Sequence, residues 1–421
     1  MKGTKAQRFL PFAMFGVAAF FYLYEFLLRV APNVLYEVLT DEFQLNAKSF
    51  GILASSYYWS YAALQLPIGA WVDKFGPRRL LTFAILVCAI STILFANTHS
   101  YIVACWARFF IGAGSAFAFI CCLKIVSIWF PPNWFPVLVG FTLMLGTLGA
   151  VASVPLSFAM NYMDWRQLLI IIGGVGILLG ILCWIVIRDH NPNQANPELI
   201  AEHGGAHQVG FWASVREIAL HPFNWVVGIY AFLVTAPSDA LGGSWGVPFL
   251  EQVHHFSRDM ATTAAAMTFL GMALGSPLLG WLASALHSRK KPMFFAALVA
   301  CGALVALIYF PSLSLWGAAA CFFVFGAAGT YVLAFVVIRE INHMKYVGTA
   351  VGFTNFLSIL GSALLTFIIG YVLDTVRSGG TVDGVPLYTA LDYQKGLLLV
   401  PVFYAVTAFV IVPLIRQKRD L

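Results

Sequence analysis

Twelve blocks of about 20 mostly apolar residues follow one another along this 421-residue chain. A helix needs roughly 20 apolar residues to cross the hydrocarbon core of a bilayer, which is about 30 Å thick. The backbone finds no water there, so a helix that satisfies its own hydrogen bonds is the favoured structure. The blocks predict an all-α membrane protein with twelve transmembrane helices. The expected spans are residues 9–30, 49–71, 80–96, 101–128, 134–160, 167–187, 223–250, 261–286, 292–310, 313–338, 346–372 and 396–415.

The charged residues and cysteines exclude several other classes of protein. Only 10% of the residues are charged, against about 25% in a soluble domain. The 24 Lys and Arg residues occur in twos and threes between apolar blocks, which is typical of loops and not of nucleic-acid binding. Neither a nucleic-acid partner, a metal nor a cofactor is expected. The cysteines all lie inside apolar blocks and are expected to be free and buried: Cys88, Cys105, Cys121, Cys122, Cys183, Cys301 and Cys321.

The distribution of basic residues predicts the orientation in the membrane. With the N-terminus inside, sixteen Lys and Arg residues fall in cytoplasmic segments, five in outer loops and three within spans. This asymmetry places both termini in the cytoplasm, as in a protein of a bacterial inner membrane. Lys2, Lys5 and Arg8 precede the first block like the start of a secretory signal. That block is too long and has no small-residue cleavage site, so it is expected to be an uncleaved span.

The chain also repeats itself. The sequence Val139-Gly140-Phe141-Thr142 recurs 212 positions later as Val351-Gly352-Phe353-Thr354. The hydrophilic stretch 190–221 separates six spans from six. We expect an N-terminal six-helix bundle at residues 1–189, a cytoplasmic linker at 190–221 and a C-terminal six-helix bundle at 222–421. Two parallel halves with a site between them suit a carrier that exposes the site alternately to each side.

A loop motif between the second and third spans points to a family. It reads Gly69-Ala70-Trp71-Val72-Asp73-Lys74-Phe75-Gly76-Pro77-Arg78-Arg79. This resembles G-x-x-x-D-[RK]-x-G-[RK]-[RK], the signature of the major facilitator superfamily of secondary transporters, with Pro77 in place of one basic residue. The resemblance implies twelve helices in two pseudo-symmetric bundles. It also implies a conformational latch formed by Gly69, Asp73, Lys74, Gly76 and Arg78. In this latch the glycines permit a tight turn and Asp73 pairs with a helix end or an arginine.

The fourth span resembles a second pattern of this family, R-x-x-x-G-x-G, at Arg108, Gly112 and Gly114. The resemblance associates this arginine with proton coupling, and we consider it for substrate binding as well. A charge near the bilayer centre costs at least about 2.5 to 3.5 kcal/mol and needs a partner or a wet cavity. The alternative is a purely structural ion pair. Asp164-Trp165-Arg166 resembles another short family sequence and is expected to anchor the sixth span at the membrane interface.

Glu25 and Arg29 of the first span are the most informative charges. They are spaced i, i+4 with the acid first, so they share a helix face in the favoured order. Arg29 offers a planar fork that suits a carboxylate or phosphate, and Glu25 is a candidate to carry a coupled proton. Family members that carry organic anions often have such an arginine in this span. The alternative is that the two side chains only neutralise each other.

The seventh span holds Asp239 among Pro237, Gly242 and Gly243, which predicts a bent helix. Asp239 is the second candidate for the proton, ranked after Glu25; its alternatives are a bound cation or a cap of the broken turn. Trp245 of this span either lines the cavity and contacts substrate or belongs to the outer aromatic belt. Asn355 of the eleventh span reaches either the substrate cavity or, in the reading we favour, a neighbouring helix.

These features predict a secondary transporter and no enzyme, since G-x-S-x-G, H-E-x-x-H and phosphate-binding loops are all missing from the sequence. The leading hypothesis is a monomeric symporter that takes up a small organic anion or zwitterion with protons. A proton-driven exporter of lipophilic or cationic compounds is the alternative, and a membrane sensor without transport is less favoured. The sequence leaves the substrate itself open.

Overall fold

The computed structural model describes residues 5–131, 134–189, 211–310, 312–329, 331–343, 346–382 and 385–415. Nearly all of these residues are helical. The first half contains α1 (Lys5–Val34), α2 (Tyr36–Phe43), α3 (Ala47–Gln65), α4 (Ile68–Phe75), α5 (Pro77–Asn97), α6 (Tyr101–Ser115), α7 (Phe117–Trp129), α8 (Phe135–Val151), α9 (Ser153–Ala159) and α10 (Trp165–Val186).

The second half begins with a short helix in the stretch expected to be the linker; residues 190–210 of that stretch lie outside the described part. Its elements are α12 (Phe211–Leu220), α13 (Pro222–Pro237), η3 (Ser238–Trp245), α14 (Gly246–His254), α15 (Arg258–Ala285), α16 (Lys290–Tyr309), α17 (Leu315–Ala328), α18 (Val332–Ile341), α19 (Val347–Val376), α20 (Ala390–Gly396), α21 (Leu399–Val406), η5 (Thr407–Ile411) and α22 (Val412–Leu414). A two-stranded antiparallel sheet, β1 (Thr381–Val382) with β2 (Val385–Pro386), precedes α20.

Eleven helical segments of the described chain are long and apolar enough to cross a membrane, and they match eleven of the twelve expected spans. The second expected span, 49–71, is the exception. It consists of α3, which is rich in serine and tyrosine, and of α4 beyond Pro67. Most of α3 is buried, and it packs on α6 and α19. A helix covered by other helices need not be apolar, which explains why composition alone marks this span weakly.

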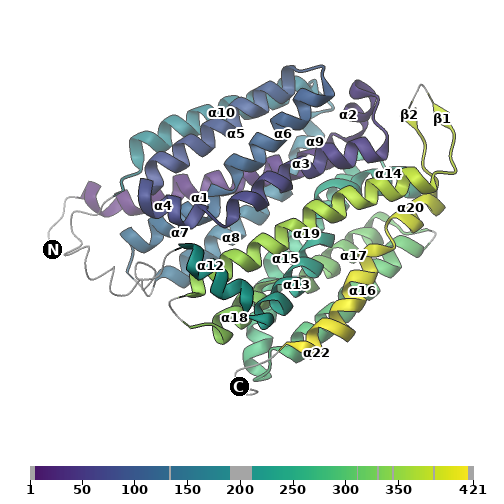
Figure 1. Ribbon diagram of the computed structural model, residues 1–421. Helices are drawn as coiled ribbons and strands as arrows, with labels where there is room; N and C mark the ends of the chain where they lie inside the picture. Colours follow the sequence, from purple (N-terminus) through teal and green to yellow (C-terminus); the bar gives the residue numbers. More distant parts are fainter. Residues whose placement is uncertain are drawn as a thin grey trace.

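The helices form an elongated bundle whose two ends differ (Figure 1). We call the end with α2, α20, β1 and β2 the distal end, and the end with α4, α12, α18 and α22 the proximal end. The helices of the first half lie together on one side and those of the second half on the other. The halves contact each other most extensively through α3 with α19, α8 with α15, and α1 with η3. Further contacts join α9 to α15, α1 to α14 and α15, and α2 to α14.

Hydrogen bonds between the halves gather near the distal end. The Tyr388 hydroxyl accepts a bond of 2.8 Å from the Ala47 amide, and Ser157 donates a bond of 2.6 Å to Asp259. Near the proximal end, the Asn355 side chain donates to Gln65 at 2.6 Å. A Cβ atom on Gly370 would overlap the Ala47 carbonyl, so glycine there lets α3 and α19 approach closely.

Trp165 and Arg166, expected from the sequence to anchor the sixth span at the membrane interface, both have partners within the protein. Trp165 is buried and packs edge-on against Phe95, with ring centroids 6.3 Å apart. Arg166 pairs with Glu42 at 2.6 Å and donates 3.0 Å to the Thr98 carbonyl. The guanidinium finds these acceptors on α2 and at the end of α5, so the sequence Asp164-Trp165-Arg166 fastens distal segments of the first half together.

Candidate functional site

Four charged side chains meet inside the bundle. Glu25 and Arg29 come from α1, Arg108 from α6 and Asp239 from η3, and each is at most 5% exposed. Removing a charge from water costs several kcal/mol unless partners compensate it. Such groups inside a membrane protein are by default candidates for a functional site. We call these four residues the charge cluster.

Glu25 and Arg29 form a closed network within the first half. Arg29 Nη2 lies 3.2 Å from Glu25 Oε1 and 3.4 Å from Oε2. The Tyr57 hydroxyl of α3 donates 2.6 Å to Glu25 Oε2 and accepts 3.4 Å from Arg29 Nε. The guanidinium also lies 4.1 Å from the Phe26 ring centroid. The two residues that donate to Glu25 therefore both belong to its own half.

Asp239 is held mainly by the second half. The Ser362 hydroxyl of α19 donates 2.7 Å to Asp239 Oδ2. Arg29 Nη1 lies 4.0 Å from Asp239 Oδ1, which is beyond hydrogen-bond distance. The Arg29–Asp239 pair spans the two halves and is looser than the Arg29–Glu25 pair. The guanidinium therefore also faces the interface between the halves, where the Asp239 carboxylate lies 4.0 Å from it.

The bend expected in the seventh span is a π-helical turn. The stretch η3 (Ser238–Trp245) begins after Pro237 and contains Gly242 and Gly243. The Gly246 amide bonds the Leu241 carbonyl, five residues earlier. Turns of this kind are rare and occur mostly at functional sites. This turn places Asp239 opposite Arg29 of α1.

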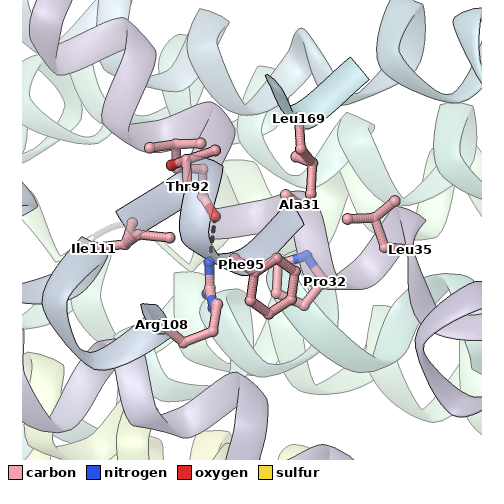
Figure 2. Close-up of a pocket in the computed structure, with 9 residues that line it drawn as sticks. Ala31, Pro32, Leu35, Thr92, Phe95, Arg108, Ile111 and Leu169 are labelled. Atoms are coloured by element: carbon pink, nitrogen blue, oxygen red, sulfur yellow. Dashed lines mark hydrogen bonds between the residues drawn. The ribbon is translucent and has the colours of Figure 1, made fainter. Parts of the chain in front are cut away.

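Arg108 binds the backbone of α1 and makes no ion pair with a carboxylate of the described residues. Its Nη1 donates 2.7 Å to the Leu28 carbonyl, the bond drawn as a dashed line in Figure 2. Its Nη2 donates 3.3 Å to the Arg29 carbonyl. Pro32 explains the first bond: it has no N–H, so the Leu28 carbonyl lacks its usual partner four residues on. A cavity of about 10 Å³ beside Arg108, Pro32 and Thr92 has room for about one water molecule.

Two residues considered for substrate binding lie apart from the charge cluster. Trp245 is completely buried, and its indole donates 3.0 Å to the Thr366 carbonyl while packing on Phe50 with ring centroids 5.0 Å apart. It belongs to the packing between α3, η3 and α19 and not to an outer aromatic belt. Asn355 bonds Gln65 across the halves.

Tyr57 and Ser362 are site residues that the sequence reasoning missed. Tyr57 lies in the run Ser55-Ser56-Tyr57-Tyr58-Trp59-Ser60-Tyr61. So many hydroxyl groups in one expected span were a signal that the helix faces polar partners. Ser362 has no comparable signal, because single serines are common in membrane helices.

In the loop motif, the structure assigns the turn to Gly76 alone. Gly76 has φ +78° and ψ 154°, a conformation nearly restricted to glycine. Gly69 instead lies within α4 and has no close neighbour. The Arg78 amide donates 2.8 Å to Asp189 Oδ1, and Arg78 Nε donates 2.9 Å to the Trp184 carbonyl. The motif is thus bound to the end of α10 in its own half; the side chain of Asp73 lies outside the described part.

Replacing Gly76 with Ala is expected to destabilise the protein by about 1 to 3 kcal/mol, because the required backbone conformation strains an L-residue. A Cβ atom at this position would also lie 2.5 Å from Asp189 Oδ1. The measurement is the thermal unfolding temperature in detergent. Gly302→Ala is the matched control, since a Cβ atom there meets nothing within 4 Å. Equal unfolding temperatures for the two variants would contradict the assignment.

The second half has a related basic segment without the aspartate. Here Arg289 pairs with Glu340 of α18, with Nη2 and Oε1 3.0 Å apart. The basic segment of the first half therefore bonds Asp189, whereas that of the second half pairs with Glu340.

The family model of the Major Facilitator Superfamily matches residues 13–366 of the chain. This chain belongs to the major facilitator superfamily. It is a multi-pass membrane protein with the all-α fold of these transporters, and the family consists of transporters and not of enzymes.

Curated relatives extend along most of this superfamily member. The membrane sensor protein UhpC of Escherichia coli K12 is 24% identical over 93% of this chain and 91% of its own. The probable sulfoacetate transporter SauU of Cupriavidus necator is 21% identical over 86% of this chain and 87% of its own. Among solved structures, a bacterial homologue of the human lysosomal transporter Spinster, inward-facing and unoccupied, superposes with a TM-score of 0.79 over 98% of this chain and 97% of that one. Its sequence identity of 18% supports the fold alone.

Proposed function

We propose that this chain is a proton-coupled symporter that takes up a small organic anion or zwitterion by alternating access. The observation that carries the proposal is the position of Arg29. It is bound firmly to Glu25 of its own half and lies 4.0 Å from Asp239 of the other half. An anion that reaches the interface between the halves competes with Asp239 for the side of this guanidinium that faces the second half. The planar fork of the guanidinium suits a carboxylate or phosphate.

Proton coupling follows from the same competition. Once the anion occupies Arg29, Asp239 is a buried carboxylate without a cation, and this costs several kcal/mol. Taking up a proton removes that cost. The charge cluster holds two acids and two arginines, so it is neutral when all four are ionised. One proton per negative charge of substrate keeps it neutral, which predicts electroneutral transport of a monoanion.

Arg108 acts in this mechanism through α1. Its guanidinium bonds the carbonyls of Leu28 and Arg29 and fixes the backbone from which the Arg29 side chain extends. We therefore assign Arg108 a positioning role rather than direct contact with substrate.

The loop motif, including Asp73 and Lys74, governs interconversion of the two conformations.

The topology belongs to the proposal as well. The excess of basic residues in the proximal loops supports a cytoplasmic position for that end, with the inner membrane of a bacterial cell as the location. Residues 1–189 and 222–421 then move as two bundles in a monomer. The distal end faces outward.

The relatives support an anion and also name a second candidate. SauU is named as a probable carrier of sulfoacetate, an organic anion. UhpC is named as a membrane sensor, so a sensor without transport is the second candidate function. An exporter of cationic compounds fits less well, because two arginines lie in the charge cluster.

Two measurements on the purified protein test these functions. A thermal-shift panel covers mono- and dicarboxylates, sugar acids, organophosphates, amino acids, peptides and cationic compounds. The compound that stabilises the protein is then offered to proteoliposomes under an imposed pH gradient, with an internal dye reporting protons. We expect an anion to be taken up with one proton per negative charge. A compound that binds the protein but is not moved across the membrane would establish the sensor. If only cationic compounds stabilise the protein and the pH gradient drives their efflux, the protein is the exporter.

A further inference from the structure

Asn33 of α1 enters the π-helical turn of the other half. Its side chain is 3% exposed and lies one turn beyond Arg29. Asn33 Nδ2 donates 2.7 Å to the Gly242 carbonyl, and the Val247 amide donates 2.9 Å to Asn33 Oδ1. The side-chain amide of Asn33 therefore bonds the backbone of one segment, residues 242–247, with both its donor and its acceptor.

The spacing of these two backbone groups explains the contact. In a π-helix each amide bonds the carbonyl five residues earlier, as the Gly246 amide does with Leu241. The next bond in that series would join the Val247 amide to the Gly242 carbonyl. Asn33 stands between these two groups and offers a donor to one and an acceptor to the other. A side chain of the first half thus takes the place of a backbone hydrogen bond in the second.

This replacement is reversible without leaving either backbone group of the second half unpaired, while the Asn33 amide turns to the water that enters between the separated ends. When the distal ends of the halves separate, the Val247 amide and the Gly242 carbonyl can bond each other and close the turn. An unpaired buried amide or carbonyl would cost about 1 to 3 kcal/mol, so this exchange removes a barrier to opening. The bond between Ser157 and Asp259 does not touch the turn that carries Asp239. Trp245, at the end of that turn, contacts the first half by packing on the rings of Tyr36 and Phe50.

We propose that Asn33 is the positioning residue that docks η3 on α1 whenever the distal end is closed. In this state it holds Asp239 opposite Arg29, and on distal opening it withdraws and η3 closes on itself. The proposal rests on the alternating access proposed above but not on the substrate or on the proton. Its test therefore needs neither, and its failure is distinguishable from a failure of proton coupling.

The experiment measures how fast a water-soluble maleimide labels single introduced thiols in the purified full-length protein. Ala47→Cys reports the distal end, where Ala47 is completely buried at the interface. Gly352→Cys reports the proximal end, where a Cβ atom has room 3.8 Å from the Gln65 carbonyl. The half-buried Cys105, Cys301 and Cys321 are first replaced by Ala.

Asn33→Leu keeps the number and branching of the side-chain heavy atoms and removes both hydrogen bonds. We expect labelling at position 47 to rise about tenfold, the effect of losing two buried hydrogen bonds, and labelling at position 352 to fall. Asn97→Leu is the matched control, because the exposed Asn97 only bonds Ile93 of its own helix. A general loosening of the fold would raise both rates, and that result, or no change in either, would overturn the proposal.

A second variant separates hydrogen bonding from packing. Asn33→Asp keeps the acceptor for the Val247 amide but replaces the donor to the Gly242 carbonyl with a second oxygen. Two acceptor oxygens then face each other and repel. We expect it to open the distal end at least as much as Asn33→Leu, with a normal elution profile and helical circular dichroism. If Asn33→Leu opens the distal end and Asn33→Asp does not, packing and not hydrogen bonding closes it, and the proposal is wrong.

Discussion

Replacing Asp239 with Asn is expected to abolish accumulation of substrate against a gradient while exchange of substrate across the membrane continues. Asn keeps the size of the side chain and can still bond Ser362, but it cannot bind or release a proton in the physiological range. Exchange needs no net movement of protons, so it survives. Proteoliposomes loaded with unlabelled substrate measure exchange, and empty ones under a pH gradient measure accumulation. In the variant, substrate is expected to reach only equal concentrations on both sides.

Glu25→Gln is the matched comparison for this experiment. Reasoning from sequence ranks Glu25 first as proton carrier, because Arg29 is one helical turn away. The geometry favours Asp239, because Glu25 keeps two donors within its own half whereas Asp239 has Arg29 only across the interface. We expect Glu25→Gln to lower binding, and with it both exchange and accumulation. Accumulation that persists in Asp239→Asn and is lost selectively in Glu25→Gln would reverse the assignment.

Replacing Arg29 with Lys is expected to raise the KM for an anionic substrate about 10- to 100-fold, the value of one lost charge-assisted hydrogen bond. Lysine keeps the charge but concentrates it on one nitrogen. A single ammonium nitrogen cannot reach Glu25, the Tyr57 hydroxyl and an anion at the same time, whereas the separate nitrogens of the guanidinium point toward all three. The measurement is the concentration dependence of uptake into proteoliposomes.

The control for this prediction is Arg166→Lys, at the distal end of the first half. Arg166 also pairs with an acid and bonds backbone carbonyls, but it lies on α10 and contacts Glu42 and Thr98. Its replacement is expected to leave KM unchanged. An unchanged KM in Arg29→Lys would mean that Arg29 serves only to neutralise Glu25.

The sequence predicts most spans of this protein because length and apolarity are local properties. The same is true of the Glu25–Arg29 pair, since an i, i+4 spacing fixes which side chains share a helix face. The bend near Asp239 is also local, because Pro237 and two glycines loosen any helix. Its form as a π-helical turn depends on contacts from α1 and α19 that no local pattern contains.

The partners across the molecule escaped prediction for a physical reason. Arg29 and Asp239 lie on different halves, and twelve helices can pack in many ways that bury both. The acceptors of Arg108 are backbone carbonyls, which every residue carries, so no residue type marks them. Asp189, which binds the turn at Gly76, lies just beyond a span and resembles any loop residue.

Because Pro32 leaves the Leu28 carbonyl without a backbone donor, substitutions at positions 32 and 108 depend on each other. Alanine at position 32 would restore an N–H that competes with Arg108 for the Leu28 carbonyl and would leave a buried cation short of an acceptor. A neutral residue at position 108 would instead leave that carbonyl without a donor. Either change alone is costly, while the two together restore an ordinary helix. Drift at one position is therefore constrained by the other, and homologues should keep both residues or lose both.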